Sequence, residues 1–346
     1  MKIAIEKSDA GFVSRWVEFC KKEAIPHKIV DPCSNTIISE LSDCDAFMWH
    51  WSHVDFAKLQ FARQLTMSLE QAGKKVFPDS RTSWHFDDKV GQKYLLEALG
   101  APLVDSYVFY TRDAALDWCG KTTFPKVFKL RGGAGASNVR LVRTRAQAQK
   151  LIRQAFARGI PVFDRLGHLR DAIWKFKSHQ IGIVGVAKAL ARSIIGTRFS
   201  TLHGRERGYV YFQDFIPDNN SDIRVVAIGK RAFAIRRMCR KGDFRASGSG
   251  LIEYPVNDDA IKKCVEICFA VNRKLQMQSC AMDFVYSGTN PYIVEISYGF
   301  TQQGYEKCPG YWDDELRFHE GKFNPQYWMV EDLIASVNGG KNGPER

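Results

Sequence analysis

Over the first 79 residues, two patterns of apolar and polar positions alternate: short apolar runs, and longer segments with apolar residues on one helical face. The short runs KIAIE, HKIVD, DAFMWHW and KVFPD have the length and composition of buried strands. The segments FVSRWVEFCKKEA and FAKLQFARQLTMSLEQAG have hydrophobic residues every three or four positions, which predicts helices. Strands that alternate with helices predict a parallel sheet covered on both faces.

The alternation continues beyond this region and then becomes richer in strands. A helix is expected over 88–99, followed by strands at SYVFYT, PKVFKL and NVRLVRT and by helices at RDAALDWC and RAQAQKLIRQAFARG. Further on, VYFQDFI reads as a strand, and DIRVVAIGKRAFAIRRMCR predicts a β-hairpin that turns at Gly229-Lys230. IKKCVEICFAVNRKLQ is an amphipathic helix, and CAMDFVYSG and PYIVEIS form a second hairpin-like pair. The expected fold class is therefore α/β.

Composition narrows the class of protein. The chain has 346 residues, of which 45% are hydrophobic and 12% aromatic, so a globular protein of two or three lobes is expected. No apolar run is long enough to span a bilayer, and the N-terminus lacks a secretory pattern. Nine cysteines occur without a CxxC pair, and Cys264 and Cys268 have helical spacing among apolar neighbours. These features predict reduced, buried thiols in a cytoplasmic protein without a zinc site.

The net charge of +12 favours an anionic partner such as a nucleotide, a phosphorylated sugar or nucleic acid. Much of the excess lies between residues 165 and 207, where only Asp171 and Glu206 oppose a set of basic residues. That set is Arg165, Arg170, Lys175, Lys177, Lys188, Arg192, Arg198, Arg205 and Arg207. A solvated cationic face is the alternative interpretation.

Two acids and a hydroxyl lie on the last pair of predicted strands. In PYIVEISYGF, Glu295 and Ser297 point to the same face because side chains alternate along a strand. A hairpin through SGTNP would bring Asp283 of AMDFVY beside them. Such oxygen ligands suit Mg²⁺, which takes one or two carboxylates and otherwise binds water and substrate phosphates. The alternative is a carboxylate pair on a solvated hairpin.

A lysine precedes a glycine-rich loop in FPKVFKLRGGAGAS. Lys129 ends a predicted strand, and Gly132, Gly133 and Gly135 allow the backbone to approach an anion closely. The loop is neither a Walker loop, since GK[ST] is absent, nor the dinucleotide fingerprint, since a strand follows it. Alone, such a loop is usually only a turn.

Two further segments carry polar groups in apolar surroundings. The strand FQDFI has Gln213 and Asp214 at its middle, and its backbone could line a slot for adenine. The following hairpin carries Arg224 on one arm and Arg236 and Arg237 on the other, before GDFRASGSG. Several arginines on one hairpin favour binding of a carboxylate or a phosphate. The alternative is that they form a cationic surface exposed to solvent.

The order of these motifs resembles that of the ATP-grasp superfamily. FDDK with Lys89 at a helix start precedes VFKL, the glycine-rich loop, the Q-x-F-I strand, the DIR hairpin, GDFR and finally D…ExS. The resemblance is greatest to the branch typified by the ribosomal-protein glutamate ligase and covers about residues 75–300. Residues 1–75 resemble the α/β domain that precedes the grasp in that superfamily.

The resemblance implies a two-lobed grasp domain, ATP and Mg²⁺ as cofactors, and a role for each matching residue. It places on the nucleotide Lys89, Lys129, Gly132, Gly133, Gly135, Ala136, Ser137, Gln213, Asp214, Phe215 and Ile216. It assigns Arg224 and Arg237 to the acyl phosphate or acceptor carboxylate, and Asp283, Glu295 and Ser297 to Mg²⁺. It implies a domain plan of 1–86 (pre-grasp), 87–208 (first lobe, with a basic insertion at about 160–208), 209–337 (second lobe, with a C-terminal extension) and 338–346 (disordered tail).

The chain departs from the family pattern at several places. Ser297 stands where the family has Asn, as does Ser247 in GDFRASGSG. The basic segment 160–208 is longer than usual, and the stretch from 298 to 321 matches no specificity class. The implied activity is ATP-dependent joining of a carboxylate (an acidic sugar, amino acid or peptide) to an amine, through an acyl phosphate with release of ADP. The alternatives are a kinase that stops at phosphoryl transfer, a nucleic-acid-binding protein, and a grasp fold that only binds. A homodimer is possible.

Overall fold

The computed structural model describes residues 1–8, 11–52, 56–133, 138–162, 165–177, 181–195, 204–256 and 258–341. The strands are β1 (Ile3–Glu6), β2 (His27–Val30), β3 (Ala46–Met48), β4 (Lys75–Phe77), β5 (Ser106–Phe109), β6 (Lys126–Lys129), β7 (Arg140–Val142), β8 (Ile160–Pro161), β9 (Arg205–Glu206), β10 (Val210–Asp214), β11 (Ser221–Ile228), β12 (Arg231–Met238), β13 (Ile252–Glu253), β14 (Ser279–Ser287), β15 (Asn290–Ser297), β16 (Gly310–Asp313) and β17 (Phe318–Glu320). The helices are α1 (Phe12–Lys22), α2 (Ile37–Glu40), α3 (Phe56–Gln71), α4 (Ser80–Ser83), α5 (Lys89–Ala98), α6 (Arg112–Lys121), α7 (Arg145–Phe156), α8 (Arg165–Lys177), α9 (Ile183–Ile195), α11 (Asp259–Leu275) and α12 (Pro325–Lys341), with a 3₁₀ turn at Gln302–Gly304.

The N-terminal sheet is parallel, as its sequence pattern predicted. Its strand order is β2-β1-β3-β4. Alternate side chains enter two cores: Ala4 and Phe47 lie in the core that includes α3, whereas Ile5 and Met48 lie in the core that includes α1. The expectation of a parallel sheet covered on both faces is therefore confirmed.

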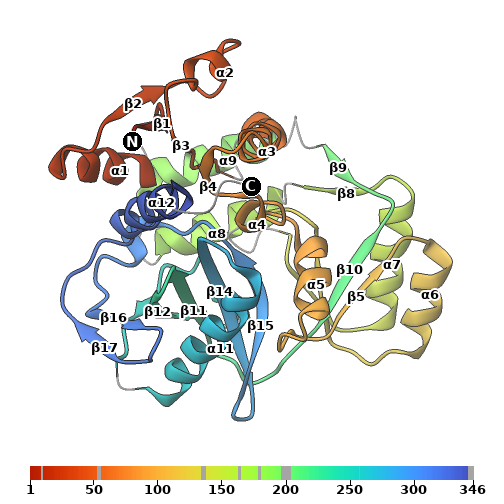
Figure 1. The fold of residues 1–346 in the computed structure, drawn as a ribbon. Helices are drawn as coiled ribbons and strands as arrows, with labels where there is room; N and C mark the ends of the chain where they lie inside the picture. Colours follow the sequence, from red (N-terminus) through yellow and green to blue (C-terminus); the bar gives the residue numbers. More distant parts are fainter. Residues whose placement is uncertain are drawn as a thin grey trace.

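Helix α12 returns from the C-terminal end of the chain to this N-terminal sheet. It packs against α1 and β4, and Figure 1 shows it beside α1. Trp328, Leu333 and Val337 are buried in the same core as the face of the sheet that α1 covers. Because these side chains anchor the helix, it continues to Lys341. The expectation of a disordered tail from 338 is therefore wrong for residues 338–341, and residues 342–346 lie outside the described part of the chain.

The second sheet is antiparallel, in the order β5-β10-β6-β7. Phe128 and Phe212 point to one face, where α6 and α7 supply the remainder of a separate core. Lys129 and Gln213 are on the opposite face because side chains alternate along each strand. Strand β10 follows the expected boundary at 208 but completes this sheet, so the chain leaves the first lobe only after Asp214.

The third sheet has the order β15-β14-β11-β12-β16-β17, with β13 paired to β12. The predicted hairpin is present, since β11 ends at Ile228 and β12 starts at Arg231 on either side of Gly229-Lys230. One face, with Val225 and Met282, shares a core with α11. The other face is apolar at one end, where Val226 packs toward α12, and polar at the other end. This sheet belongs to the second lobe, and its strand β15 meets Lys89 and Lys129 of the first lobe.

The basic segment forms a pair of helices, α8 and α9, that pack against each other. The pair contacts the loop after β12, where the Arg240 guanidinium lies 4.5 Å from the centroid of the Trp174 ring. Several of its apolar side chains are exposed, with Ile183 at 73% and Val184 at 62%. In the part of the chain that the structure describes, no helix is both long and apolar enough to cross a membrane.

Candidate active site

Three elements that are distant in sequence bring Lys89, Lys129 and Glu295 together. Lys89 begins α5, and its Nζ lies 3.0 Å from Glu295 Oε1 on β15. Lys129 ends β6, and its Nζ donates to Gln213 Oε1 at 2.6 Å and to Val294 O at 3.4 Å. Both lysines are buried, whereas the side chain of Glu295 is 32% exposed. The two predicted phosphate-binding lysines and one predicted metal ligand thus share one site between the second and third sheets.

A β-bulge explains how β15 meets Lys129. The register pairs Asp283 with Glu295 and Phe284 with Ile293, which leaves Val294 as an extra residue. A bulged residue is left out of the ladder, and its carbonyl is free for another donor. The Val294 carbonyl accepts from Lys129. The bulge thereby connects the first lobe, through Lys129, to the strand of the second lobe that carries Glu295.

The two lysines differ in their electrostatic balance. Burial lowers the pKa of Lys129 to about 8, and the nearby charge of Lys89 lowers it further while Glu295 opposes the shift. Burial also acts to lower the pKa of Lys89, but Glu295 and Asp87 outweigh it, and the pKa of Lys89 is raised. Lys89 is therefore a permanent cation, whereas Lys129 carries a charge that its surroundings only partly compensate.

The predicted arginines and Asp283 form a buried ion-pair network on the same face. Arg224 donates to both carboxylate oxygens of Asp283 at 2.5 and 2.7 Å, and Arg237 Nη2 lies 2.8 Å from Asp283 Oδ2. Arg237 also donates to both oxygens of Asp222 at 2.6 Å. Burial acts to raise the pKa of Asp283, but Arg224 and Arg237 outweigh it and hold that pKa below its usual range. Register explains the network, because Arg224 is directly opposite Asp283 and Asp222 opposite Arg237.

The donor set fits a magnesium ion that brings phosphate and water ligands with it. Glu295 is accessible, and Asp283 is its direct cross-strand neighbour. However, Asp283 could bind a metal only by releasing an arginine, and Ser297 Oγ exchanges hydrogen bonds with the backbone of Gly299 at 3.1 Å. No group of three or more His, Cys, Asp or Glu side chains in the described ranges could hold a metal alone. Mg²⁺ tolerates such a sparse protein shell because it keeps waters and substrate oxygens.

Asp87 and Lys89 hold the described start of the glycine-rich loop. Gly133 N donates to Asp87 Oδ1 at 2.7 Å, and its carbonyl accepts from Lys89 Nζ at 2.7 Å. A Cβ on Gly132 would lie 3.0 Å from Asp87 Oδ2, so a larger residue there would push the Asp87 carboxylate aside. The remaining predicted loop residues, Gly135, Ala136 and Ser137, lie outside the described part of the chain.

The segment predicted to bind adenine follows directly from β10. Gln213 points toward Lys129 and donates to Ser106 Oγ at 3.0 Å, whereas Asp214 points to the opposite face and pairs with Lys126 at 2.6 Å. The ring of Phe215 meets that of Phe244 at 5.9 Å. Ile216 follows in the connection to β11 and is half-buried. The segment therefore bridges the two lobes beside Lys129.

Sequence reasoning missed a polar pair on the N-terminal sheet. Glu6 ends β1, and its Oε1 accepts from the backbone of His50, just beyond β3, at 3.3 Å. In the sheet, β1 lies between β2 and β3, so the chain crosses to β2 on one side of β1 and then to β3 on the other. Glu6 and His50 therefore lie at the point where the strand order reverses, which is where open α/β sheets bind ligands. The acid that ends the apolar run KIAIE was the available signal.

This pair is buried, and one of its polar atoms has no hydrogen bond within the described residues. Glu6 is 2% exposed, and its Oε2 has no hydrogen-bond partner among the described residues. Burial raises the pKa of Glu6 to about 7 and lowers that of His50 to about 4. A Cβ on Gly299 would lie 3.8 Å from His50 Nε2 and 4.0 Å from Ser297 Oγ, so the pair adjoins the end of β15.

Known structures share this arrangement of sheets. No family model matches the chain, and no curated protein matches its sequence. A RimK domain ATP-grasp protein from Sphaerobacter thermophilus has a TM-score of 0.56 at 12% identity, over 97% of this chain and 100% of that one. D-cycloserine synthetase DcsG has a TM-score of 0.59 at 12% identity, over 97% and 100%. D-alanine–D-alanine ligase from Bacillus anthracis, complexed with ATP, has a TM-score of 0.54 at 12% identity, over 98% and 99%.

The match extends over almost the whole of each chain, including the N-terminal parallel sheet and both lobes. The chain therefore has the ATP-grasp fold.

Proposed function

We propose that this protein is an ATP-dependent carboxylate–amine ligase that works through an acyl phosphate and releases ADP. The observation that carries the proposal is the convergence of Lys89, Lys129 and Glu295 from three elements, on a fold shared with D-alanine–D-alanine ligase and D-cycloserine synthetase. Two buried cations beside a partly exposed carboxylate can hold a polyphosphate together with its divalent ion.

In the proposed reaction, a carboxylate oxygen attacks the γ-phosphorus of ATP, the bond to the ADP oxygen breaks, and an acyl phosphate forms. An amine nitrogen then attacks the acyl carbon, phosphate leaves, and the nitrogen gives up a proton. Magnesium held by Glu295, and by Asp283 if it releases an arginine, would neutralise phosphate charge. Lys89 and Lys129 would hold the phosphates in place, because phosphoryl transfer depends chiefly on positioning and electrostatics.

Arg224 and Arg237 would face the acyl phosphate and the oxyanion formed on amine attack. Their present partners are Asp283 and Asp222. Guanidinium groups bind carboxylate and phosphate oxygens in the same bidentate manner, so an incoming anionic group could take over donors that Asp283 now uses. Pre-orientation by the aspartates would keep both arginines in place before substrate binds.

The acceptor amine would bind at the switch point of the N-terminal sheet. Glu6 offers an unpartnered carboxylate oxygen next to the end of β15, and a carboxylate of pKa about 7 can pair with an ammonium group or accept its proton. The net charge of +12 favours an anionic carboxylate substrate such as an acidic sugar, amino acid or peptide.

The product of ATP tests this proposal. We expect ADP and phosphate to form when the protein meets ATP, Mg²⁺ and a matched carboxylate and amine, together with a new amide in the organic product. A screen of paired carboxylates and amines with separation of ADP from AMP measures this directly. AMP as product would indicate adenylation, and a stable phosphorylated compound without an amide would indicate a kinase; either result contradicts the ligase proposal.

The affinity for ATP should fall as pH rises through about 8. The pKa of Lys129 is about 8 in the free protein, and bound phosphate would favour its charged form, so binding takes up a proton above that pH. Calorimetric titration with ATP on either side of pH 8, in buffers of different ionisation enthalpy, measures both the affinity and the proton uptake. Lys129→Arg keeps its charge throughout and should show no such dependence. An unchanged wild-type affinity across this range would contradict the role of Lys129.

A further inference from the structure

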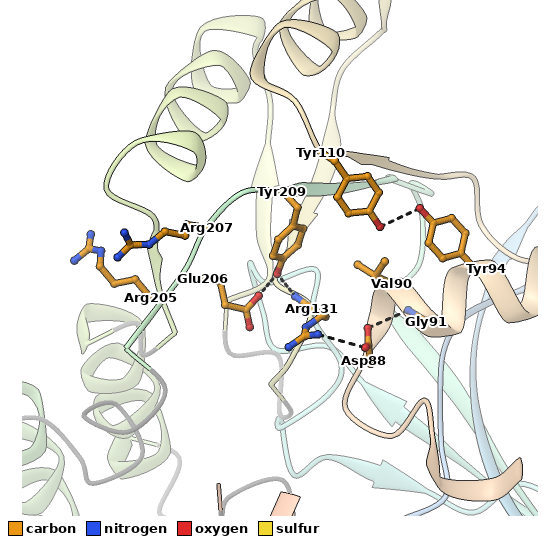
Figure 2. A pocket seen from close by; sticks show the side chains of 10 residues that line it. All are labelled: Asp88, Val90, Gly91, Tyr94, Tyr110, Arg131, Arg205, Glu206, Arg207 and Tyr209. Atoms are coloured by element: carbon orange, nitrogen blue, oxygen red, sulfur yellow. Dashed lines mark hydrogen bonds and ion pairs between the residues drawn. The ribbon is translucent and has the colours of Figure 1, made fainter. Parts of the chain in front are cut away.

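A cavity of about 560 Å³ lies beside Arg131, just before the glycine-rich loop. Figure 2 shows its lining, which comes from the start of α5, the ends of β5 and β6, and the segment from β9 to β10. None of the lining residues belongs to the proposed nucleotide or metal set. They are Asp88, Val90, Gly91, Tyr94, Tyr110, Arg131, Arg205, Glu206, Arg207 and Tyr209. The size lies in the usual range of small-molecule sites.

The charges around this cavity are unbalanced toward cations. Of its two acids, Asp88 caps α5 by accepting from Gly91 N at 3.0 Å, and Glu206 accepts from the hydroxyl of Tyr209. Arg205 and Arg207 form no ion pair with any carboxylate in the described part of the chain, although Arg205 Nε donates to Gly159 O at 3.3 Å. Arg131 Nη1 lies 3.7 Å from Asp88 Oδ2. Guanidinium groups that lack a carboxylate partner are suited to a carboxylate or phosphate ligand.

The wall of the cavity opposite Arg205 and Arg207 is aromatic. Tyr94 and Tyr110 are 47% and 58% exposed, and their hydroxyls lie 3.1 Å apart. In Figure 2 these rings stand on one side and Arg205 and Arg207 on the other, with Glu206, Tyr209 and Arg131 between them. Phenol rings give a flat apolar face with a polar edge, which suits a ligand ring that itself carries hydroxyls. A ligand that uses both walls must join a ring to an anionic group.

We propose that this cavity binds an anionic sugar, with its ring against Tyr94 and Tyr110 and its phosphate or carboxylate group toward Arg205 and Arg207. The site does not depend on the proposed ligase activity, since none of its residues has a role there. Its floor is nevertheless close to that site: Tyr209 OH accepts from Arg131 N at 2.6 Å, and Lys89 N donates to Arg131 O at 2.9 Å.

Calorimetric titration of the full chain tests this site with probes that lack adenine. Glucose 1-phosphate and glucuronate carry both a ring and an anionic group, whereas glucose and inorganic phosphate each carry one of the two. We expect one or both of the ring anions to bind at least about tenfold more tightly than glucose and phosphate, because each wall contributes. Which of the two binds more tightly identifies the anionic group. Failure of both to bind at millimolar concentration would overturn the proposal.

Paired variants locate the binding. Arg205→Gln/Arg207→Gln should weaken it by about tenfold or more, and Tyr94→Leu should weaken it by a smaller factor. The matched control is Arg143→Gln/Arg153→Gln, which removes two exposed arginines elsewhere in the first lobe. An equal loss in both double variants would mean general attraction to a basic protein and would overturn the site. Competition between the probe and ATP would also overturn the site, because it would place the probe among the nucleotide-binding residues.

Discussion

Lys129→Met should reduce ATP turnover about a hundredfold or more, because losing one preorganised charge at a phosphoryl-transfer site removes roughly 3 kcal/mol of transition-state stabilisation. The side chain is 7% exposed and lies between Gln213 and the Val294 carbonyl. Methionine has a similar length and no charge, so the surrounding packing should persist. Steady-state measurement of ADP release at saturating substrates, with each variant compared to wild type, gives the effect.

The same substitution should leave thermal stability unchanged or raise it. Burial lowers the pKa of Lys129 to about 8, which means that its charge opposes folding at neutral pH. This cost is complete below pH 8 and fades as pH rises from 8 toward the ordinary value of 10.5. An inactive variant that melts no earlier than wild type has lost a functional group rather than its fold. Lys121→Met, at an exposed lysine of α6 paired with Asp117, is the control and should keep full activity. Wild-type turnover by Lys129→Met would refute the assignment.

Local sequence patterns predicted most of the elements because each pattern is fixed by neighbours in the chain. The parallel sheet follows from strands that alternate with helices, and the hairpin at Gly229-Lys230 from alternation on both arms. Helix α12 was missed because its apolar residues pack on α1 and β4, which lie at the other end of the sequence. Strand β10 looked like the start of a new lobe, and only its pairing with β5 and β6 shows that it belongs to the first.

In the candidate site, too, some features could be predicted from the sequence and others depend on contacts between distant segments. The order of motifs was enough to group Lys89, Lys129 and Glu295, because that order reflects a shared fold. Pairings that depend on register were not accessible. Nothing in the letters DIR or AMDF shows that Arg224 faces Asp283 directly, and the bulge at Val294 has no local signature. Glu6 was missed for a related reason, since an acid at a strand end acquires meaning only when the sheet order makes it a switch point.

Glu295→Gln should also reduce ATP turnover about a hundredfold or more, and it should raise the Mg²⁺ concentration needed for half-maximal rate by about tenfold or more. The glutamate has two possible roles, as partner of Lys89 at 3.0 Å and as metal ligand. Glutamine keeps the size and can still accept from Lys89, but a neutral amide oxygen is a poorer ligand for a hard cation than a carboxylate. The substitution therefore weakens the metal role more than the lysine contact.

A Mg²⁺ titration of three variants separates these roles. Lys89→Met removes the lysine and should lower the rate without a comparable change in the Mg²⁺ requirement, whereas Glu295→Gln should change both. Glu253→Gln is the matched control, because Glu253 is an exposed acid on β13 of the same sheet, 3.9 Å from Arg236. If Glu295→Gln required no more Mg²⁺ than wild type, Glu295 would serve only to orient Lys89. The metal would then need Asp283, and binding it would require Arg224 or Arg237 to release that carboxylate, so the ion pairs on β11 and β12 would have to open in each catalytic cycle.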